Sequence, residues 1–270
     1  MAFSKVNAVY KCFDILDLLA RNNGSMGVSE IASAVDLHKS TVYNILNSLV
    51  DLGVLNKTEN KYSFGAKLYL LGHVIDYESL VVRQVRPHMQ RFSEETKLTT
   101  SFGIRAGMRL VVLERIELPG AITVATHGGK VRPLLDGAYG KAVLSILPDM
   151  EIQEILNTHE LIKRTPRTVT DRKKYLAMIQ KTRDEGVAIE RGEFYEGIWG
   201  VAVPIAIPFL NTQAVIWAFG LEIKENERAI NGYAKLLKRL ATEIVDSLDK
   251  ADSLSRLSVK RPNTNRRQVA

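Results

Sequence analysis

The chain has 270 residues, a length that allows two compact domains and excludes a peptide hormone or a single short motif. Hydrophobic residues make up 46% of the chain and charged residues 25%, which is typical of a folded globular protein. The net charge of +7 comes mainly from the tail after Asp252, which carries +5, so the total does not by itself indicate a nucleic-acid-binding domain.

Three helices are predicted in the first 52 residues. Apolar residues recur at helical spacing over residues 6–20, and a short second helix begins near Ser29, a residue suited to the N-cap position. A third helix follows closely over residues 39–52, with one apolar stripe and with Gly53 after its end. Two short helices joined by so tight a turn are typical of a helix-turn-helix.

The exposed face of the third predicted helix carries short hydroxyl and amide side chains, whereas exposed helix faces usually carry Lys, Glu, Gln and Arg. In a DNA-binding helix-turn-helix, the N-terminal part of the second helix contacts base edges, and Asn can form two hydrogen bonds with adenine. We therefore predict that Asn44 and Asn47 read bases. The other predicted DNA-binding residues of this helix are Lys39, Ser40, Thr41 and Tyr43.

A β-hairpin is predicted directly after this helix. Residues 54–57 and 61–64 have strand patterns, and the three-residue turn 58–60 joins them. Lys57 and Lys61 flank the tip, where a DNA-binding wing contacts phosphates. The alternative interpretation is a small helical domain that binds only protein.

The rest of the chain changes between helix and strand patterns. After a helical segment at residues 66–79 and a helix that includes Val85, the expected strands cover residues 101–104, 110–115, 121–126, 201–207 and 214–223. The expected helices cover residues 139–147, 151–157 and 171–185, and a long final helix extends from Ile230 to Leu248. We expect Glu114 and Arg115 to form a charged pair at a strand end. The expected fold class is α+β, with a mostly antiparallel sheet flanked by helices.

Several motifs follow one another in a fixed order along the chain. They are AVYKCFDILDLLA (residues 8–20), VSEIASAVDLHKSTVYNILNSLVDLGVL (28–55), KYSFGAKLYLLG (61–72), GKAVLSILP (140–148), RTVTD (167–171) and RDEGVAIERGEFYEGIWGVAVPI (183–205). Together they resemble the IclR family of bacterial transcriptional regulators over about residues 6–250. The resemblance implies a winged helix-turn-helix DNA-binding domain at residues 1–65, a linker helix at 66–80 and a GAF-like α/β effector-binding domain at 81–252. The remaining residues, 253–270, are a basic tail that we expect to be disordered.

Candidate ligand-binding segments contain glycine, which lets the backbone approach a ligand closely; the alternative is that they are plain turns. These segments are residues 128–129, 137–140 and 197–200. The resemblance implies that the loop entering the GKA helix donates backbone N–H groups to the effector, often a carboxylate, and a helix N-terminus is a suitable anion site. Ala138 and Tyr139 are therefore the expected donors.

The resemblance also places an acidic residue at Glu190 and a small residue at Gly200 in the pocket. The last core strand of the family commonly carries Ser or Thr where this chain has Phe219 and Leu221. This departure favours a larger or more apolar effector, such as an aromatic acid.

Aromatic side chains could supply the ring surface for such an effector. The candidates are Trp199, Trp217 and Phe219. The alternative for each of them is that it simply fills the hydrophobic core.

Enzyme classes find no support in the motifs. The chain lacks the nucleophile-elbow, phosphate-loop, dinucleotide-binding and HExxH patterns, and its five histidines show no metal-ligand spacing. The histidines are His38, His73, His88, His127 and His159. We expect neither an enzyme nor a cofactor or metal site.

Three features of the sequence bear on the cellular compartment of the protein. The single cysteine, Cys12, excludes an intrachain disulfide, and Asp14 and Asp17 interrupt what would be the apolar part of a signal peptide. The most apolar stretches, residues 201–210 and 214–221, are too short to span a membrane. We expect a cytoplasmic protein without a membrane partner.

The function predicted from these observations is that of a ligand-responsive transcription factor. It would bind palindromic double-stranded operator DNA as a homodimer or a dimer of dimers, because one short helix reads few base pairs. A small organic acid would modulate it. The alternative is a small-molecule enzyme or sensor whose helix-turn-helix mediates protein contacts.

Overall fold

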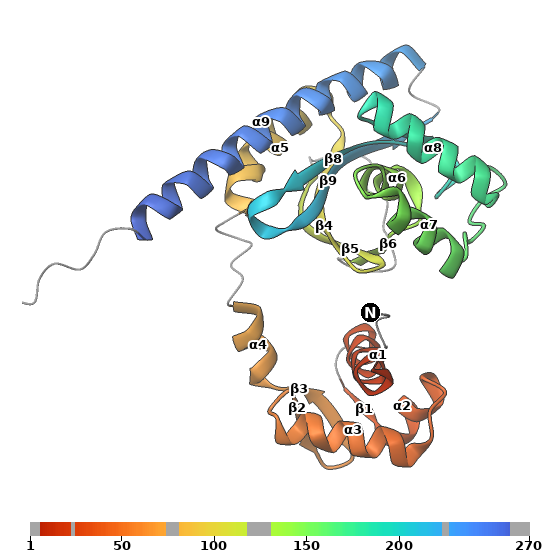
Figure 1. Cartoon of the computed structure of the whole chain (residues 1–270), viewed down its shortest axis with the longest axis vertical. Coiled ribbons are helices and arrows are strands. Elements are labelled where there is room, and N and C mark those ends of the chain that lie inside the picture. Colours follow the sequence, from red (N-terminus) through yellow and green to blue (C-terminus); the bar gives the residue numbers. More distant parts are fainter. Residues whose placement is uncertain (1–5, 23–24, 74–80, 118–130, 223–226, 260–270) are drawn as a thin grey trace, which may run out of the picture. The chain divides into compact units, whose positions relative to one another are not determined.

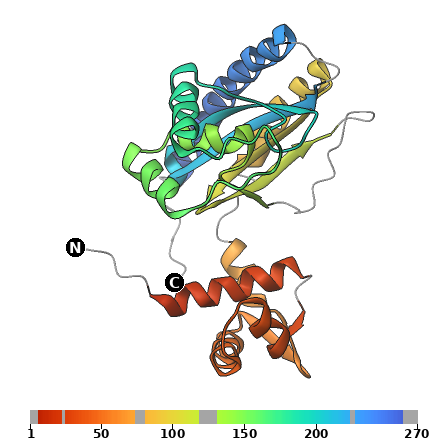
Figure 2. The ribbon, with the colours of Figure 1, turned by 90° about the vertical axis from the view of Figure 1, so that its right-hand side faces the viewer.

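The computed structural model describes residues 6–22, 25–73, 81–117, 131–222 and 227–259. Its contacts divide the chain into two compact units, residues 1–76 and 77–270, each of which encloses hydrophobic core (Figures 1 and 2). Among the described residues, none of the helices combines the length and the hydrophobicity that crossing a lipid bilayer requires.

The first unit contains four helices and a small antiparallel sheet among its described residues. They are α1 (Asn7–Arg21), β1 (Met26–Gly27), α2 (Val28–Ala34), α3 (Lys39–Asp51), β2 (Leu55–Thr58), β3 (Lys61–Phe64) and α4 (Ala66–His73), with the strand order β1-β3-β2. The helix-turn-helix and the hairpin predicted from the sequence are confirmed. Two details differ: Thr58 pairs with Lys61, so the hairpin turn has two residues instead of three, and α4 belongs to the first unit.

The core of this unit follows from the apolar stripes of its helices. Ile15 and Leu19 on α1 and Leu46 on α3 are fully buried in one cluster. Gly65 is required where the hairpin returns to α3, because a Cβ there would lie 2.3 Å from the carbonyl oxygen of Gly53. Burial of one side of α3 leaves the opposite side for another partner.

The second unit is built on one antiparallel sheet. In chain order its described elements are α5 (Arg83–Thr96), β4 (Thr99–Ala106), β5 (Arg109–Ile116), β6 (Val131–Pro133), α6 (Gly137–Ser145), α7 (Asp149–Thr158), α8 (Arg172–Glu185), β7 (Ala188–Arg191), β8 (Ile198–Ile207), a short 3₁₀ turn (Pro208–Leu210), β9 (Thr212–Leu221) and α9 (Glu227–Val259). Six strands lie in the order β6-β5-β4-β9-β8-β7, and the expected α+β architecture is confirmed.

Three predictions about this unit need correction or cannot be compared. The sequence patterns missed β6 and β7, which have three and four residues and carry little periodicity. The strand expected at 121–126 lies outside the described residues. Helix α9 extends to Val259, beyond the expected start of a disordered tail at 253, because neither Gly nor Pro interrupts the sequence between Gly232 and Pro262.

Helices cover the two faces of this sheet unequally. Helices α5 and α9 cover one face, and α6 and α8 lie on the other (Figure 1). Alternation of side chains along β9 explains the division, because Ile216 and Ala218 join the core against α5 and α9 whereas Val215 and Trp217 join the core against α6. The α6 face contains the polar cavity described below.

Candidate functional sites

The recognition surface predicted on the first unit lies on α3 and the hairpin. Because Val42, Leu46 and Leu49 are buried, the other side of α3 is turned outward. Of the predicted DNA-binding residues, Thr41 and Asn47 are half-buried, and the exposed ones are Lys39, Ser40, Tyr43, Asn44, Lys57 and Lys61. Their roles remain predictions, but the exposure of most of them is compatible with contact to DNA.

A cation–π cluster joins the hairpin to α3. The Nζ atom of Lys57 lies 5.8 Å from the centroid of the Tyr43 ring and 5.6 Å from that of Tyr62. These three side chains also line a groove of about 350 Å³ beside the start of α2. The Tyr62 hydroxyl is buried there and has no hydrogen-bond partner within the described part of the chain. The sequence did not single out Tyr62, since a buried strand tyrosine is indistinguishable from core.

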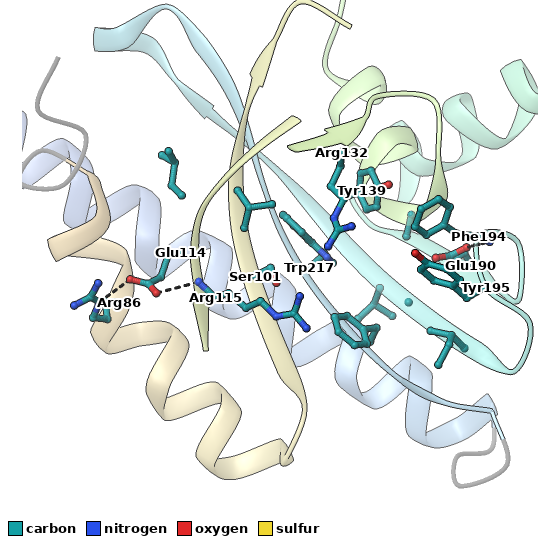
Figure 3. Close-up of a pocket in the computed structure, with 17 residues that line it drawn as sticks. Arg86, Ser101, Glu114, Arg115, Arg132, Tyr139, Glu190, Phe194, Tyr195 and Trp217 are labelled. Atoms are coloured by element: carbon teal, nitrogen blue, oxygen red, sulfur yellow. Dashed lines mark hydrogen bonds and ion pairs between the residues drawn. The ribbon is translucent and has the colours of Figure 1, made fainter. Parts of the chain in front are cut away.

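The second unit contains a cavity of about 460 Å³ on the α6 face of its sheet (Figure 3). Five of the seven predicted effector-binding residues line it: Ala138, Tyr139, Glu190, Gly200 and Phe219. Trp217, a predicted source of ring surface, lines it as well. Whether they bind an effector remains a prediction, but the structure brings them together around one space.

Two predicted residues do not line this cavity. Trp199 precedes Gly200 on β8, and successive strand residues point to opposite faces, so its ring lies on the α9 side and stacks on Tyr233 with centroids 5.5 Å apart. Leu221 pairs with Ile198 at the end of β9 but does not line the cavity itself. Of the glycine segments, residues 128–129 lie outside the described residues.

One end of the cavity is formed by a buried carboxyl group at the start of α6. The Glu190 carboxylate accepts a hydrogen bond from the backbone N–H of Phe194 at 3.2 Å, and it lies beside Gly137 at the start of α6. The pKa of Glu190 is raised to about 7, because burial and the neighbouring Glu193 outweigh Lys141 and the backbone N–H groups of Phe194 and Ala138, which lower it. This carboxyl group can therefore change its charge near neutral pH.

Steric contact with Glu190 explains why glycine stands at two neighbouring positions. A Cβ on Gly200 would lie 3.2 Å from the Oε1 atom of Glu190, and a Cβ on Gly137 would meet the same atom at 3.2 Å. A residue larger than glycine at either position would push the carboxyl group.

A buried ion pair connects α6 to the segment after β7. The Lys141 side chain is 1% exposed, and its Nζ atom donates to both carboxylate oxygens of Glu193 at 2.7 Å. Glycine is required at position 140, because a Cβ there would lie 2.0 Å from the carbonyl oxygen of Leu134. The first turn of α6 is thus closely fixed against its surroundings.

Arginine side chains supply positive charge elsewhere in the cavity. Arg86, Arg115 and Arg132 all line it, and none of them was predicted from the sequence. They lie on α5, β5 and β6, so no local spacing links them. The Cζ atom of Arg115 lies 5.5 Å from the centroid of the Phe219 ring, a cation–π arrangement.

The expected pair between Glu114 and Arg115 is wrong. Glu114 forms its ion pair with Arg86 at 2.6 Å, and Arg115 forms its own with Glu117. Glu114 contacts Arg115 only through the backbone, because its Oε1 atom accepts the N–H of Arg115 at 2.9 Å. Burial lowers the pKa of Arg115, and Arg132 lowers it further, whereas Glu117 raises it.

Aromatic rings form the wall between the two ends. The Tyr139 ring lies edge-on to Phe194 with centroids 6.3 Å apart, and 5.5 Å from the ring of Trp217. Its hydroxyl is buried and has no hydrogen-bond partner among the described residues. A cavity with ring surface, guanidinium groups and unsatisfied polar atoms is suited to a flat ligand with polar ends.

Metal binding finds no structural basis in the described ranges. No group of three or more His, Cys, Asp or Glu side chains there is arranged to hold a metal ion.

Two protein-family models match the chain. The one described as "IclR helix-turn-helix domain" matches residues 8–59, and the one described as "Bacterial transcriptional regulator IclR C-terminal" matches residues 77–245. Among curated relatives, KdgR of Escherichia coli is 27% identical over 241 residues, covering 88% of this chain and 91% of KdgR. KipR of Bacillus subtilis is 26% identical over 243 residues, covering 89% of this chain and 96% of KipR.

Solved structures share the fold. An IclR transcriptional regulator from Alicyclobacillus acidocaldarius superposes with a TM-score of 0.69 at 23% identity, covering 91% of this chain and 100% of that one. An IclR homolog from Microbacterium hydrocarbonoxydans, complexed with 4-hydroxybenzoate, has a TM-score of 0.69 at 19% identity. The match covers 90% of this chain and 99% of that one.

Proposed function

Because the chain belongs to the IclR family of bacterial transcriptional regulators, we propose that it binds a two-fold symmetric operator and responds to a small aromatic acid. The family and the relatives are transcriptional regulators and not enzymes. The single observation that carries the proposal is the pairing of a polar, lysine-flanked recognition surface with a separate ring-lined cavity. A bacterial protein that binds operator DNA would act in the cytoplasm.

The DNA-binding part of the proposal rests on the chemistry of α3 and the hairpin. Exposed amide and hydroxyl groups can read base edges, and Asn44 is exposed on the outward side of α3. Lys57 and Lys61 on the hairpin are exposed and supply positive charge for phosphates. Tyr43 keeps Lys57 beside α3, so both elements would approach one DNA surface together.

Assembly as a dimer or a dimer of dimers is supported by an apolar surface on α1. Val6, which directly precedes α1, is 61% exposed, and Val9 and Phe13 on α1 are 52% and 64% exposed. Their helical spacing places these three apolar side chains on one side of the helix, where they are open to solvent. A second copy would cover these side chains. Two-fold related recognition helices would then meet half-sites about 34 Å apart, which multiplies the specificity of one short helix.

The effector part rests on the cavity of the second unit. Trp217 and Phe219 offer ring surface, and the arginine side chains offer charge for an acid. The Microbacterium hydrocarbonoxydans homolog, which shares the fold, was crystallised with 4-hydroxybenzoate. Such a ligand would regulate DNA binding by binding more tightly to one arrangement of the paired DNA-binding units than to another.

Selection of genomic fragments tests the DNA-binding proposal. Purified full-length protein is incubated with fragmented genomic DNA at physiological salt, and the captured fragments are sequenced. We expect an enriched inverted repeat. Uniform recovery with and without 4-hydroxybenzoate would contradict the proposal and favour a helix-turn-helix used for protein contacts.

Substitution of the predicted base-reading residues then tests the surface. Asn44→Ala and Asn47→Ala should each weaken binding to the enriched repeat by about 1–3 kcal/mol and relax its sequence preference, since each removes a potential base contact. Asn22→Ala, at the end of α1, is the matched control and should bind normally. Unchanged affinity and preference in both α3 variants would exclude α3 as the base-reading element.

A further inference from the structure

An acidic side chain of the protein itself lies at the anion site expected at the start of α6. The resemblance placed an effector carboxylate on the N–H groups of Ala138 and Tyr139, but the carboxylate of Glu190 lies beside this helix start, where a Cβ on Gly137 would be 3.2 Å from its Oε1 atom. Glu190 is only 8% exposed and accepts a hydrogen bond from the N–H of Phe194 at 3.2 Å. A ligand carboxylate at this end would lie close to an internal one.

Charge also disfavours a ligand carboxylate there. Glu190 lines this end of the cavity. Glu193 does not line it, but it is near enough to raise the pKa of Glu190, and it binds the buried cation Lys141 at 2.7 Å. A third carboxylate would add repulsion in a region from which water is largely excluded. The polarity of this end suits a neutral hydrogen-bonding group.

Positive charge predominates at the β5 and β6 end. Three arginines line the cavity there with one carboxylate, Glu114, which is paired with Arg86 at 2.6 Å. Arg115 on β5 is directly opposite Ser101 on β4, and Ser101 is opposite Trp217 on β9, so the three side chains lie in one row on the cavity face. Arg132 is 8% exposed, and its guanidinium points to the same space as that of Arg115 (Figure 3). Glu190 lies across the cavity, beside Phe194 and Tyr195 (Figure 3).

Two features show that this end can take an anion. The Nη2 atom of Arg115 is buried and has no hydrogen-bond partner in the described part of the chain. Arg132 lowers the pKa of Arg115, as expected for two cations that repel each other. A carboxylate placed between them would satisfy the buried donor and remove the repulsion.

We propose that Arg115 and Arg132, and not the start of α6, bind the carboxylate of the effector. The ring of the effector then lies against Trp217 and Phe219, and its neutral polar end faces Tyr139 and Glu190. The unpartnered Tyr139 hydroxyl is available for that end. This inference rests on the proposed function of the cavity as the effector site and reverses the orientation that the resemblance implies.

Isothermal titration of the full-length protein with two matched probes tests the orientation. 4-Hydroxybenzoate and its neutral amide, 4-hydroxybenzamide, differ only at the carboxyl end. Wild type should bind the acid about tenfold or more tightly than the amide, because a charged hydrogen bond contributes that much. Arg115→Gln and Arg132→Gln should each reduce this preference about tenfold or more while leaving affinity for the amide within about threefold.

Control variants separate a local role from loss of folding. Arg105→Gln changes an arginine of β4 that pairs with Glu151 and does not line the cavity, so it should keep the wild-type preference. Retained affinity for the amide shows that a variant is folded, and Arg115→Lys should restore part of the preference by restoring the charge.

The outcomes distinguish this inference from the proposed function. If wild type prefers the acid and both arginine variants keep that preference, the orientation is wrong and the cavity remains an aromatic-acid site. Equal affinity of wild type for acid and amide would also overturn the orientation alone. If wild type binds neither probe, the proposed aromatic-acid class fails, and the orientation fails with it.

Discussion

The two faces of the six-stranded sheet use the same strands for different purposes. The face against α5 and α9 is apolar, and Trp199 is fully buried there against Tyr233. The face against α6 buries Glu190 and Lys141 and contains a cavity of about 460 Å³. Buried charge and empty space cost stability, so the α6 face is expected to contribute less to the stability of this unit than the face against α5 and α9.

The largest expected effect contrasts the two tryptophans. Trp199→Ala should destabilise the second unit by about 3–5 kcal/mol, because the side chain is fully enclosed. Trp217→Ala should cost clearly less, since one side of that ring already borders the cavity. The chain has only these two tryptophans, so in each variant the fluorescence of the other one reports unfolding of this unit in denaturant. Equal losses would show that the two faces are packed alike.

A smaller loss is expected when the buried ion pair under α6 is broken. Glu193→Gln leaves the Lys141 ammonium buried without its counter-charge and should cost about 3–4 kcal/mol in the same fluorescence measurement. The double variant Lys141→Met, Glu193→Gln should recover most of that loss, because it removes both charges. A double variant no more stable than Glu193→Gln alone would show that the pair does not act as a unit.

The smallest of these effects depends on pH. The pKa of Glu190 is about 7 in the folded protein and near 4.5 when the chain is unfolded, so the folded state holds a proton that the unfolded state has lost between these values. Stability should therefore fall by about 2–3 kcal/mol as pH rises from about 4.5 to 7, and change little above that range. In the Glu190→Gln variant, the free energy of unfolding should lack this part of the pH dependence. Denaturant unfolding of both proteins at pH 5, 6, 7 and 8 measures it. The same slope in both proteins would assign the effect to another group.

Local sequence patterns predicted the first unit well because its signals are local. Apolar spacing identified α1, α2 and α3, and two short strand patterns separated by turn residues identified the hairpin. The predicted three-residue turn was one residue too long. Glu59 adopts a left-handed conformation with φ 55°, which lets β2 extend to Thr58. The outward residues of α3 followed directly from its buried stripe.

The cavity was predicted only in part. Motif resemblance located Tyr139, Glu190 and Gly200, which lie in continuous sequence motifs. The separate prediction that Trp199 offers ring surface to the effector was wrong, because aromatic character alone does not state which face of a strand a side chain takes. Arg115 and Arg132 carry no local signal, since the two belong to different strands and meet only when the sheet forms.

The sequence by itself thus determined the helices, most of the strands, the outward side of α3 and the family, because periodicity and motif order are properties of short, continuous segments. The tertiary structure alone decided which strand residues face the cavity, which carboxylate lies beside the start of α6 and where arginine side chains gather. Those features depend on strand register and on contacts between segments distant in the chain, which a linear pattern does not contain.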